Sequence, residues 1–235
     1  MFFSKRIIAF AIVMIIMLGI FEVLGAERHI NHFSCGSEDV AKIAITIDDW
    51  YSRELLPEFL DTANEYNCKL TFYPVGVNLL PEDRELWLRV IDEGHEIGNH
   101  SNTHINLEKA SRDRIIRQLE KMEKRLVECI GQDYELNTVR FPFGAGRHKG
   151  TKSSFAKAIK DAGYIHAIFW NVDTTDADEI LRKTKNGSII LLHSNNKDLR
   201  AFKKILPVFQ ERGLEMVTVS ELLGLTKTSP LPPND

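Results

Sequence analysis

Beyond residue 40 the chain alternates short runs rich in β-branched and aromatic residues with longer stretches of helical periodicity. Such alternation predicts a parallel sheet covered by helices, arranged either as an open doubly wound sheet or as a barrel. The predicted strands are residues 42–48, 69–76, 95–99, 138–142, 164–173, 188–193 and 214–219. The predicted helices between them are residues 53–66, 82–93, 108–130, 152–162, 176–185 and 198–212.

The N-terminal segment differs from the rest of the chain. Lys5 and Arg6 precede fifteen uncharged residues, 7–21, and small residues follow as far as Ala26. This order is typical of an export signal, and the run is short for a bilayer span, which needs about 20 apolar residues. We predict a signal peptide or N-terminal membrane anchor over 1–26, a linker over 27–39, one folded domain over 40–224 and a flexible tail over 225–235.

Composition excludes one class of function and limits the use of cysteine. The formal net charge is −3 and no stripe of lysine or arginine is present, so nothing favours binding to nucleic acid. Cys35, Cys68 and Cys129 are widely spaced and odd in number, which does not resemble a disulfide framework or a metal knuckle. We expect at least one free thiol and no catalytic cysteine.

Polar side chains that a core would reject stand at or just beyond five of the seven predicted strand ends. Both possible architectures bind ligands there, on the loops that follow the strands. Two adjacent carboxylates repel each other, and burying an unpaired one is costly. The side chains are Asp48 with Asp49, His100 with His104, Arg140, Asp173 with Asp176, and His193.

The two histidines are candidate metal ligands. His100 and His104 are four residues apart, so one helical turn would bring both imidazoles to the same face. Alone this spacing is a weak signal that is more often a capping or surface pair. Two histidines and a carboxylate are, however, a known catalytic zinc set that leaves a position open for water. An aspartate pair on a neighbouring strand end therefore favours a metal site.

Three further residues could serve catalysis or only structure. Arg140 carries a permanent positive charge whose planar fork can hold a carboxylate, or it is a surface residue of a tight loop. His193 ends an apolar strand and could be a satisfied core residue. A carboxylate such as Asp176 could instead orient that histidine and raise its pKa.

The ordered segments TIDD, HSNTH, RFPFG, WNVDTTD and LLH resemble the five motifs of the polysaccharide deacetylase family, carbohydrate esterase family 4. The resemblance covers about residues 40–224, which would form the catalytic domain. It implies an α/β fold, a distorted and incomplete (β/α)7 barrel, and a metal-dependent N- or O-deacetylase.

The resemblance also implies roles for individual residues. Asp49, His100 and His104 match the metal ligands, usually for zinc, although cobalt or another divalent ion is accepted. Asp48 matches the catalytic base, and Arg140 matches the residue that holds this base.

Further matches concern the acid and the substrate. His193 matches the catalytic acid and Asp176 its tuning carboxylate. Leu191 matches the residue that lines the pocket for the acetyl methyl group, and a backbone N–H near Phe143 would hold the oxyanion.

Two positions depart from the family pattern. Trp50 stands where the family usually has glycine, and Ala177 stands where it usually has tryptophan. We predict that Trp50 binds substrate by reshaping the groove wall that position 177 leaves open.

The expected function is removal of N-acetyl groups from an N-acetylglucosamine polysaccharide, with peptidoglycan favoured and chitin oligomers or an exopolysaccharide open. An O-acetyl esterase acting on xylan-like polymers and a glycan-binding homologue without turnover are the alternatives. We expect a monomer outside the cytoplasm, secreted or held at the membrane by its N-terminal segment, whose partner is an N-acetylated cell-wall or extracellular glycan.

Overall fold

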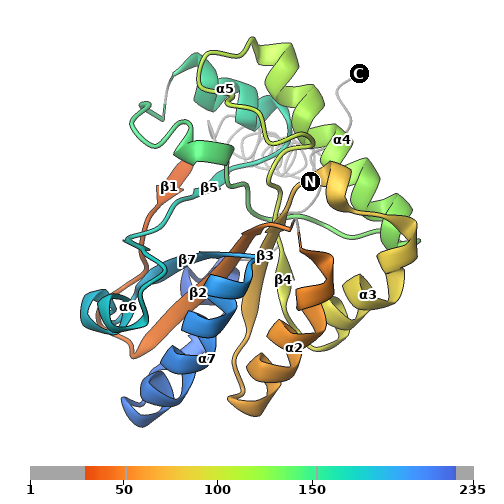
Figure 1. Ribbon diagram of the computed structural model, residues 1–235. Helices are drawn as coiled ribbons and strands as arrows, with labels where there is room; N and C mark the ends of the chain where they lie inside the picture. The colour runs from red at the N-terminus through yellow and green to blue at the C-terminus, as the bar shows by residue number, and fades with distance from the viewer. Residues whose placement is uncertain (1–29, 51, 152, 226–235) are drawn as a thin grey trace, which may run out of the picture.

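The computed structural model describes residues 30–50, 52–151 and 153–225 (Figure 1). Its main sheet is parallel and has the order β4-β3-β2-β7-β6, with β8 paired to the first residues of β2. A separate two-stranded sheet joins β1 and β5. The strands are β1 (Asn31–Phe33), β2 (Lys42–Asp49), β3 (Leu70–Pro74), β4 (Glu96–Ile97), β5 (His166–Ile168), β6 (Val172–Asp173), β7 (Ile189–His193) and β8 (Glu215–Val217).

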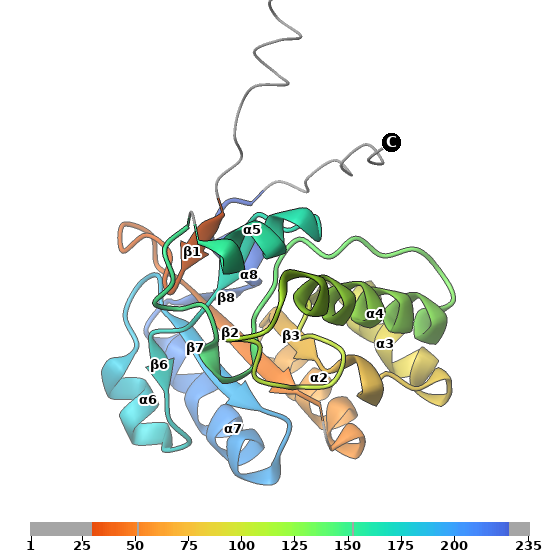
Figure 2. The same ribbon diagram turned by 90° about the horizontal axis from the view of Figure 1, so that it is seen from above.

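Helices surround the strands. Figures 1 and 2 show α6, α7, α2, α3 and α4 in succession around the outside of the main sheet, and α5 packs against α4. The helices are α2 (Leu56–Glu65), α3 (Arg84–Asp92), α4 (Arg112–Ile130), α5 (Ser154–Asp161), α6 (Ala177–Lys183), α7 (Asn196–Glu211) and α8 (Val219–Leu222). The predicted α/β architecture, a distorted (β/α)7 barrel, is confirmed.

The barrel is incomplete because one predicted strand is reduced to a single bridge. Residues 138–142 contribute only Val139, which bridges Asn99 on one side and Ala167 on the other. The predicted strand over residues 164–173 is two short strands, β5 and β6, which belong to different sheets. Regular pairing of the main sheet therefore breaks between β4 and β6, where the bridges of Val139 lead to β5 and its partner β1.

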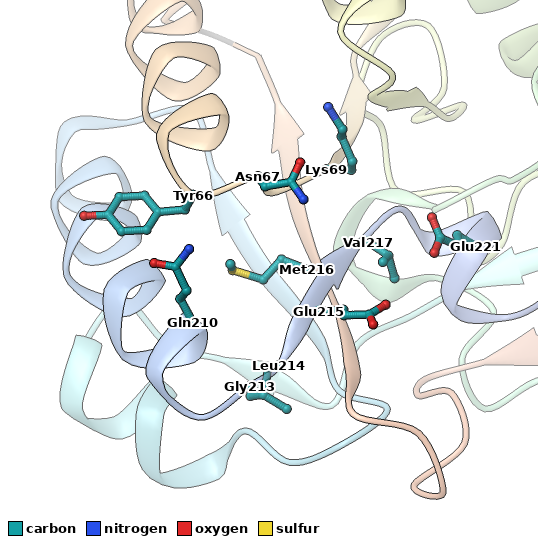
Figure 3. Close-up of a pocket in the computed structure, with 10 residues that line it drawn as sticks. All are labelled: Tyr66, Asn67, Lys69, Gln210, Gly213, Leu214, Glu215, Met216, Val217 and Glu221. Carbon is teal, nitrogen blue, oxygen red and sulfur yellow. The ribbon is translucent and has the colours of Figure 1, made fainter.

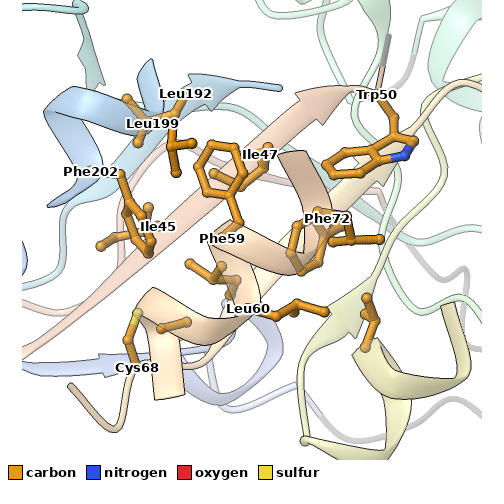
Figure 4. Close-up of a cluster of buried hydrophobic side chains, with 14 of the residues drawn as sticks. Ile45, Ile47, Trp50, Phe59, Leu60, Cys68, Phe72, Leu192, Leu199 and Phe202 are labelled. Carbon is orange, nitrogen blue, oxygen red and sulfur yellow. The ribbon is translucent and has the colours of Figure 1, made fainter. Parts of the chain in front are cut away.

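The largest cluster of buried side chains lies between the main sheet and the helices around it. Ile45 and Ile47 of β2 point into it, and Phe59 of α2 meets Phe202 of α7 with ring centroids 5.4 Å apart (Figure 4). Burying each of these large apolar side chains contributes about 1.5–3 kcal/mol. Because strand residues alternate in direction, Ala44, Thr46 and Asp48 of β2 face the other side of the sheet.

Trp50 belongs to this core and not to a groove. Its side chain is 2% exposed and meets Phe72 and Trp87 edge-on, with ring centroids 5.9 and 5.5 Å away. Ala177 lies in α6 at the margin of the same cluster. The predicted substrate contact of Trp50 is wrong, because its backbone has φ +70° and its ring turns into the helix layer.

The N-terminal prediction needs one correction. Residues 27–39 were expected to form a linker, but β1 pairs with β5 and Cys35 bridges Ser188, so the folded unit includes this stretch from Ile30. The predictions for residues 1–26 and 226–235 lie outside the described residues. In the part of the chain that the structure covers, no helix combines the length and apolar character needed to cross a bilayer. All three cysteines are free thiols, as expected.

A pocket of about 440 Å³ opens at the end of the sheet where β2 begins (Figure 3). Its lining includes Lys69, Met216 and Glu221, and β8 pairs there with Lys42–Ala44. None of the predicted site residues lines it. The polar groups described below lie at the opposite end of β2.

Candidate metal centre and catalytic groups

The register of the parallel strands brings several predicted residues to one edge of the sheet. Asp48 at the end of β2 pairs with His193 at the end of β7, and Thr46 pairs with Leu191 two residues earlier. Successive side chains alternate between the faces of a strand, so these four share the inner face of the barrel. The edge of the sheet therefore holds both a carboxylate and an imidazole.

Asp49, His100 and His104 converge on one point. Oδ1 of Asp49 lies 2.9 Å from Nε2 of His104 and 3.3 Å from Nε2 of His100. Candidate ligand atoms from the three residues all lie within 4.8 Å of one another. Oδ1 is buried, yet no hydrogen bond of good geometry reaches it. Two imidazole nitrogens and a carboxylate oxygen that converge in this way are a donor set for a cation, so the residues suit a divalent metal ion.

A loop brings the two imidazoles together, not the helical turn that their spacing suggested. Residues 100–106 form no helix, and Ser101 and His104 have φ of +65° and +52°. The side-chain oxygen of Gln118 on α4 accepts hydrogen bonds from the backbone N–H groups of Asn102 and Thr103, each 3.0 Å long. The ring centroids of the histidines are 5.2 Å apart.

The tautomer of His100 suits a metal ligand. Its Nδ1 lies 2.6 Å from the backbone carbonyl of Arg140 and must donate a proton, because a carbonyl only accepts. Nε2 is then left with its lone pair toward Asp49. Such a hydrogen bond from the far nitrogen is the usual support of a metal-bound histidine.

The predicted partner of Asp48 is present. Arg140 is buried and its Nη1 donates to Oδ1 of Asp48 at 2.8 Å. The guanidinium also donates to backbone carbonyls of Ile168 and Phe169 and stacks 4.4 Å from the ring centroid of Tyr73. These contacts fix the fork in place. The carboxylate of Asp48 is therefore held in one orientation at the edge of the sheet.

The second carboxylate is kept ionised by the histidines. Burial alone would raise the pKa of Asp49, but His100 and His104 outweigh it and hold that pKa well below its usual range. Asp48 and Asp49 thus tolerate each other through different partners, Arg140 for one and two imidazoles for the other.

The carboxylate beside His193 is Asp198, which the sequence analysis did not select. Oδ2 of Asp198 accepts a hydrogen bond from the backbone N–H of His193 at 2.8 Å and lies 3.4 Å from its Nδ1. Asp198 is fully buried, whereas the imidazole is 40% exposed. The pKa of His193 is raised, chiefly by Asp198, against the effect of burial and with smaller help from Asp48 and Asp49.

The predicted pairing of Asp176 with His193 is wrong. Asp176 is the N-cap of α6, and its carboxylate accepts a hydrogen bond from the backbone N–H of Glu179 at 2.9 Å. A local sequence signal did mark Asp198. Asn195 caps α7, and Asp198 stands three residues later, where an acidic side chain can reach back to the cap and the strand before it.

A model of the family described as polysaccharide deacetylase matches residues 36–167. The chain belongs to the polysaccharide deacetylase family. Two curated members are named peptidoglycan-N-acetylglucosamine deacetylase. The one from Bacillus cereus is 31% identical over 77% of this chain and 87% of its own length. The one from Listeria monocytogenes is 31% identical over 78% of this chain, which spans 39% of that longer protein.

Solved structures of family members have the same fold. That of the Bc1960 peptidoglycan N-acetylglucosamine deacetylase has a TM-score of 0.72 and 28% identity, covering 84% of this chain and 95% of the other. A CE4 family pseudoenzyme from Bacillus anthracis also has a TM-score of 0.72, with 24% identity over 84% of this chain and 70% of the other. Because the family includes a pseudoenzyme, the catalytic steps have to be argued from the residues of the site itself.

The two remaining residues that were predicted from the deacetylase motifs lie at the same edge. Leu191 is buried on the inner face of β7 beside Thr46. Phe143 is 68% exposed, has φ +60°, and its ring centroid lies 4.8 Å from that of His104. Residues of the predicted motifs thus lie together at this edge of the sheet. Asp198 joins the candidate site, whereas Asp176 caps α6 and Trp50 lies in the core.

Proposed function

We propose that this chain is a metal-dependent hydrolase that removes N-acetyl groups from an N-acetylglucosamine polysaccharide, with peptidoglycan as its substrate. The observation that carries the proposal is the convergence of Asp49, His100 and His104 beside a carboxylate held by Arg140. An ionised ligand set, a positioned base and an imidazole at one sheet edge are what amide hydrolysis requires.

Asp49, His100 and His104 would hold the metal ion. Two imidazole nitrogens and one carboxylate oxygen favour zinc, although cobalt or another divalent ion is compatible with this set. When bound, such an ion polarises a carbonyl group and lowers the pKa of water to about 7. The proposed metal dependence is supported by the convergence of these three residues, whose candidate ligand atoms all lie within 4.8 Å of one another.

The side chains around these ligands supply the proton transfers. Asp48 accepts the proton of the attacking water, and Arg140 holds its carboxylate in position for that transfer. His193, whose pKa is raised chiefly by Asp198, gives a proton to the departing sugar amine. We assign the backbone N–H of Phe143 to the oxyanion and the side chain of Leu191 to the acetyl methyl group.

Peptidoglycan is proposed as the substrate for two reasons. Relatives in Bacillus cereus and Listeria monocytogenes carry that substrate in their names. The segment 1–26 has the pattern of an export signal, which would place the chain outside the cytoplasm with the cell wall.

The test is acetate release from chitopentaose and from peptidoglycan after chelation, with zinc or cobalt added back. We expect release only with metal, accompanied by one new free amine for each acetate. Acetate without new amine, or release only from acetylated xylan, would point to an O-acetyl esterase. Glycan binding with no release under any metal would point to a non-catalytic homologue.

Two variants distinguish the role of the proposed base from that of the metal ligands. Asp48→Asn should abolish acetate release while zinc still binds, because the side chain keeps its shape and loses its basicity. Asp49→Ala should lose both zinc and activity. Full metal-dependent activity of Asp48→Asn would refute the assignment of the base.

A further inference from the structure

The loop that follows Arg140 is pinned beside the candidate metal centre. Its Gly146 has φ +86°, and a Cβ there would lie 2.3 Å from the ring of Phe155. The backbone N–H of Gly146 donates to Oε2 of Glu108 at 2.7 Å, and Lys149 lies 3.2 Å from the same carboxylate. The loop thus has a defined position, and Lys149 is already paired with Glu108.

Arg147 of this loop is exposed but held in a fixed orientation. Its Nη2 donates to the backbone carbonyl of Trp170 at 2.7 Å, and its guanidinium carbon lies 5.3 Å from the centroid of the Trp170 ring. Across residues 30–50, 52–151 and 153–225, no carboxylate forms an ion pair with Arg147. One edge of the fork is used by the protein, and its charge is not neutralised.

The position of Arg147 is tied to the reacting groups through the same tryptophan. The guanidinium carbon of Arg140 lies 5.6 Å from the Trp170 centroid, so the two guanidinium carbons are at most about 11 Å apart. Arg140 holds Asp48, and Phe143 stands over His104. Arg147 therefore lies at a distance from the reacting centre that neighbouring sugars of one glycan strand can span.

We propose that Arg147 binds a carboxylate carried by the sugar next to the one that loses its acetyl group. The exposed ring of Phe143 offers an apolar face to the glycan, and the planar fork of Arg147 matches a carboxylate. In peptidoglycan this neighbouring sugar is muramic acid, whose carboxylate is either the free lactyl group or a carboxylate of the attached peptide. The choice of neighbouring sugar rests on the proposed function.

The charges around the Trp170 ring favour binding of the carboxylate at Arg147. Asp173 accepts a hydrogen bond from Nε1 of Trp170 at 3.0 Å and would repel a carboxylate placed at that edge of the ring. The guanidinium lies over the ring and presents the opposite charge. An acidic ligand is therefore directed toward Arg147, whereas a neutral chitin oligomer gains nothing from it.

The test measures binding to the zinc-loaded protein. The probes are the disaccharide of N-acetylglucosamine and muramic acid with a free lactyl carboxylate, its methyl ester, the same disaccharide bearing a stem peptide, and chitobiose. Arg147→Gln should weaken binding of the free acid about tenfold, the usual cost of a lost hydrogen bond to a charged group. It should leave the methyl ester and chitobiose unchanged, and Arg147→Lys should recover part of the affinity. If only the peptide-bearing form depends on Arg147, the carboxylate belongs to the peptide.

Arg125→Gln is the matched control, because it removes an exposed arginine of α4. It should change none of the affinities. The proposal is overturned if Arg147→Gln weakens the methyl ester and chitobiose as much as the acids, or if wild-type protein binds no acid more tightly than its neutral counterpart. Failure of the proposed function would instead appear as no acetate release from any glycan, and the binding comparison would still decide the role of Arg147.

Discussion

Replacing Arg140 by methionine should destabilise the fold strongly, because it leaves the carboxylate of Asp48 buried without its cation. Arg140 is 1% exposed and its Nη1 lies 2.8 Å from Oδ1 of Asp48. Removing one partner of such a buried pair costs about 3–5 kcal/mol, a large share of a typical total stability of about 5–15 kcal/mol. Methionine keeps an apolar stem against Tyr73, so most of the loss reports on the charge.

The magnitude can be assigned to the pair by a double-mutant cycle. Asp48→Asn alone leaves a buried guanidinium unpaired and should also be costly. The double variant, Arg140→Met with Asp48→Asn, should be less destabilised than the sum of the two by about 1–3 kcal/mol. The assay is urea unfolding followed by tryptophan fluorescence, with a chelator in every sample so that metal binding does not shift the curves.

An exposed ion pair serves as the control for this cycle. Arg112 lies 2.6 Å from Asp161 with its side chain 54% exposed, and Arg112→Met should cost no more than about 1 kcal/mol. If the changes at Arg140 and Asp48 add to within about 0.5 kcal/mol, the two groups are not coupled and the reasoning about the held base is refuted.

Three further predictions concern the acid, the metal and the core. Asp198→Asn should lower the pKa of His193, because Asp198 is the main cause of its elevation, so the imidazolium is lost at lower pH. The alkaline limb of kcat then moves to lower pH, while Asp176→Asn leaves the limb in place; equal shifts would contradict the assignment. Zinc at a hundred times its Kd should stabilise the wild type by about 2.7 kcal/mol in thermal unfolding, and His104→Ala should lose this gain. Trp50→Ala should cost about 3–5 kcal/mol of stability and weaken zinc binding in a titration. At saturating zinc it should leave KM unchanged; a raised KM would show that Trp50 contacts the substrate after all.

Periodicity predicted the elements that bury a continuous apolar face. Strand β2 and helix α4 were expected over 42–48 and 108–130 and form over Lys42–Asp49 and Arg112–Ile130. It failed where pairing depends on distant partners. The segment around Val139 has the composition of a strand, but its partners are Asn99, just beyond the end of β4, and Ala167 of β5, which belongs to the other sheet, so only single bridges form.

The site was predicted where function is carried by residue type and order, and missed where it depends on tertiary contact. Arg140 meets Asp48 across 92 residues of sequence, and the motifs predicted that pairing. Asp198 was missed because the pattern of Asn195 followed by Asp198 marks only the start of a helix, and it does not show that this carboxylate is buried against a strand end. Asp176 has the same local character and remains an exposed cap.

The success with Asp49 and the failure with Trp50 have one cause. Regular alternation along β2 points Asp48 to the inner face and would send Asp49 to the helix layer and Trp50 back inside. Asp49 and Trp50 instead have φ of +75° and +70°, which shifts the alternation by one residue. The carboxylate of Asp49 then reaches the histidines and the indole enters the core. A left-handed backbone at two such residues costs about 1–3 kcal/mol each and persists only when the surroundings enforce it. Burial of the Trp50 ring supplies that enforcement, which is why its removal should loosen a metal ligand that it does not touch.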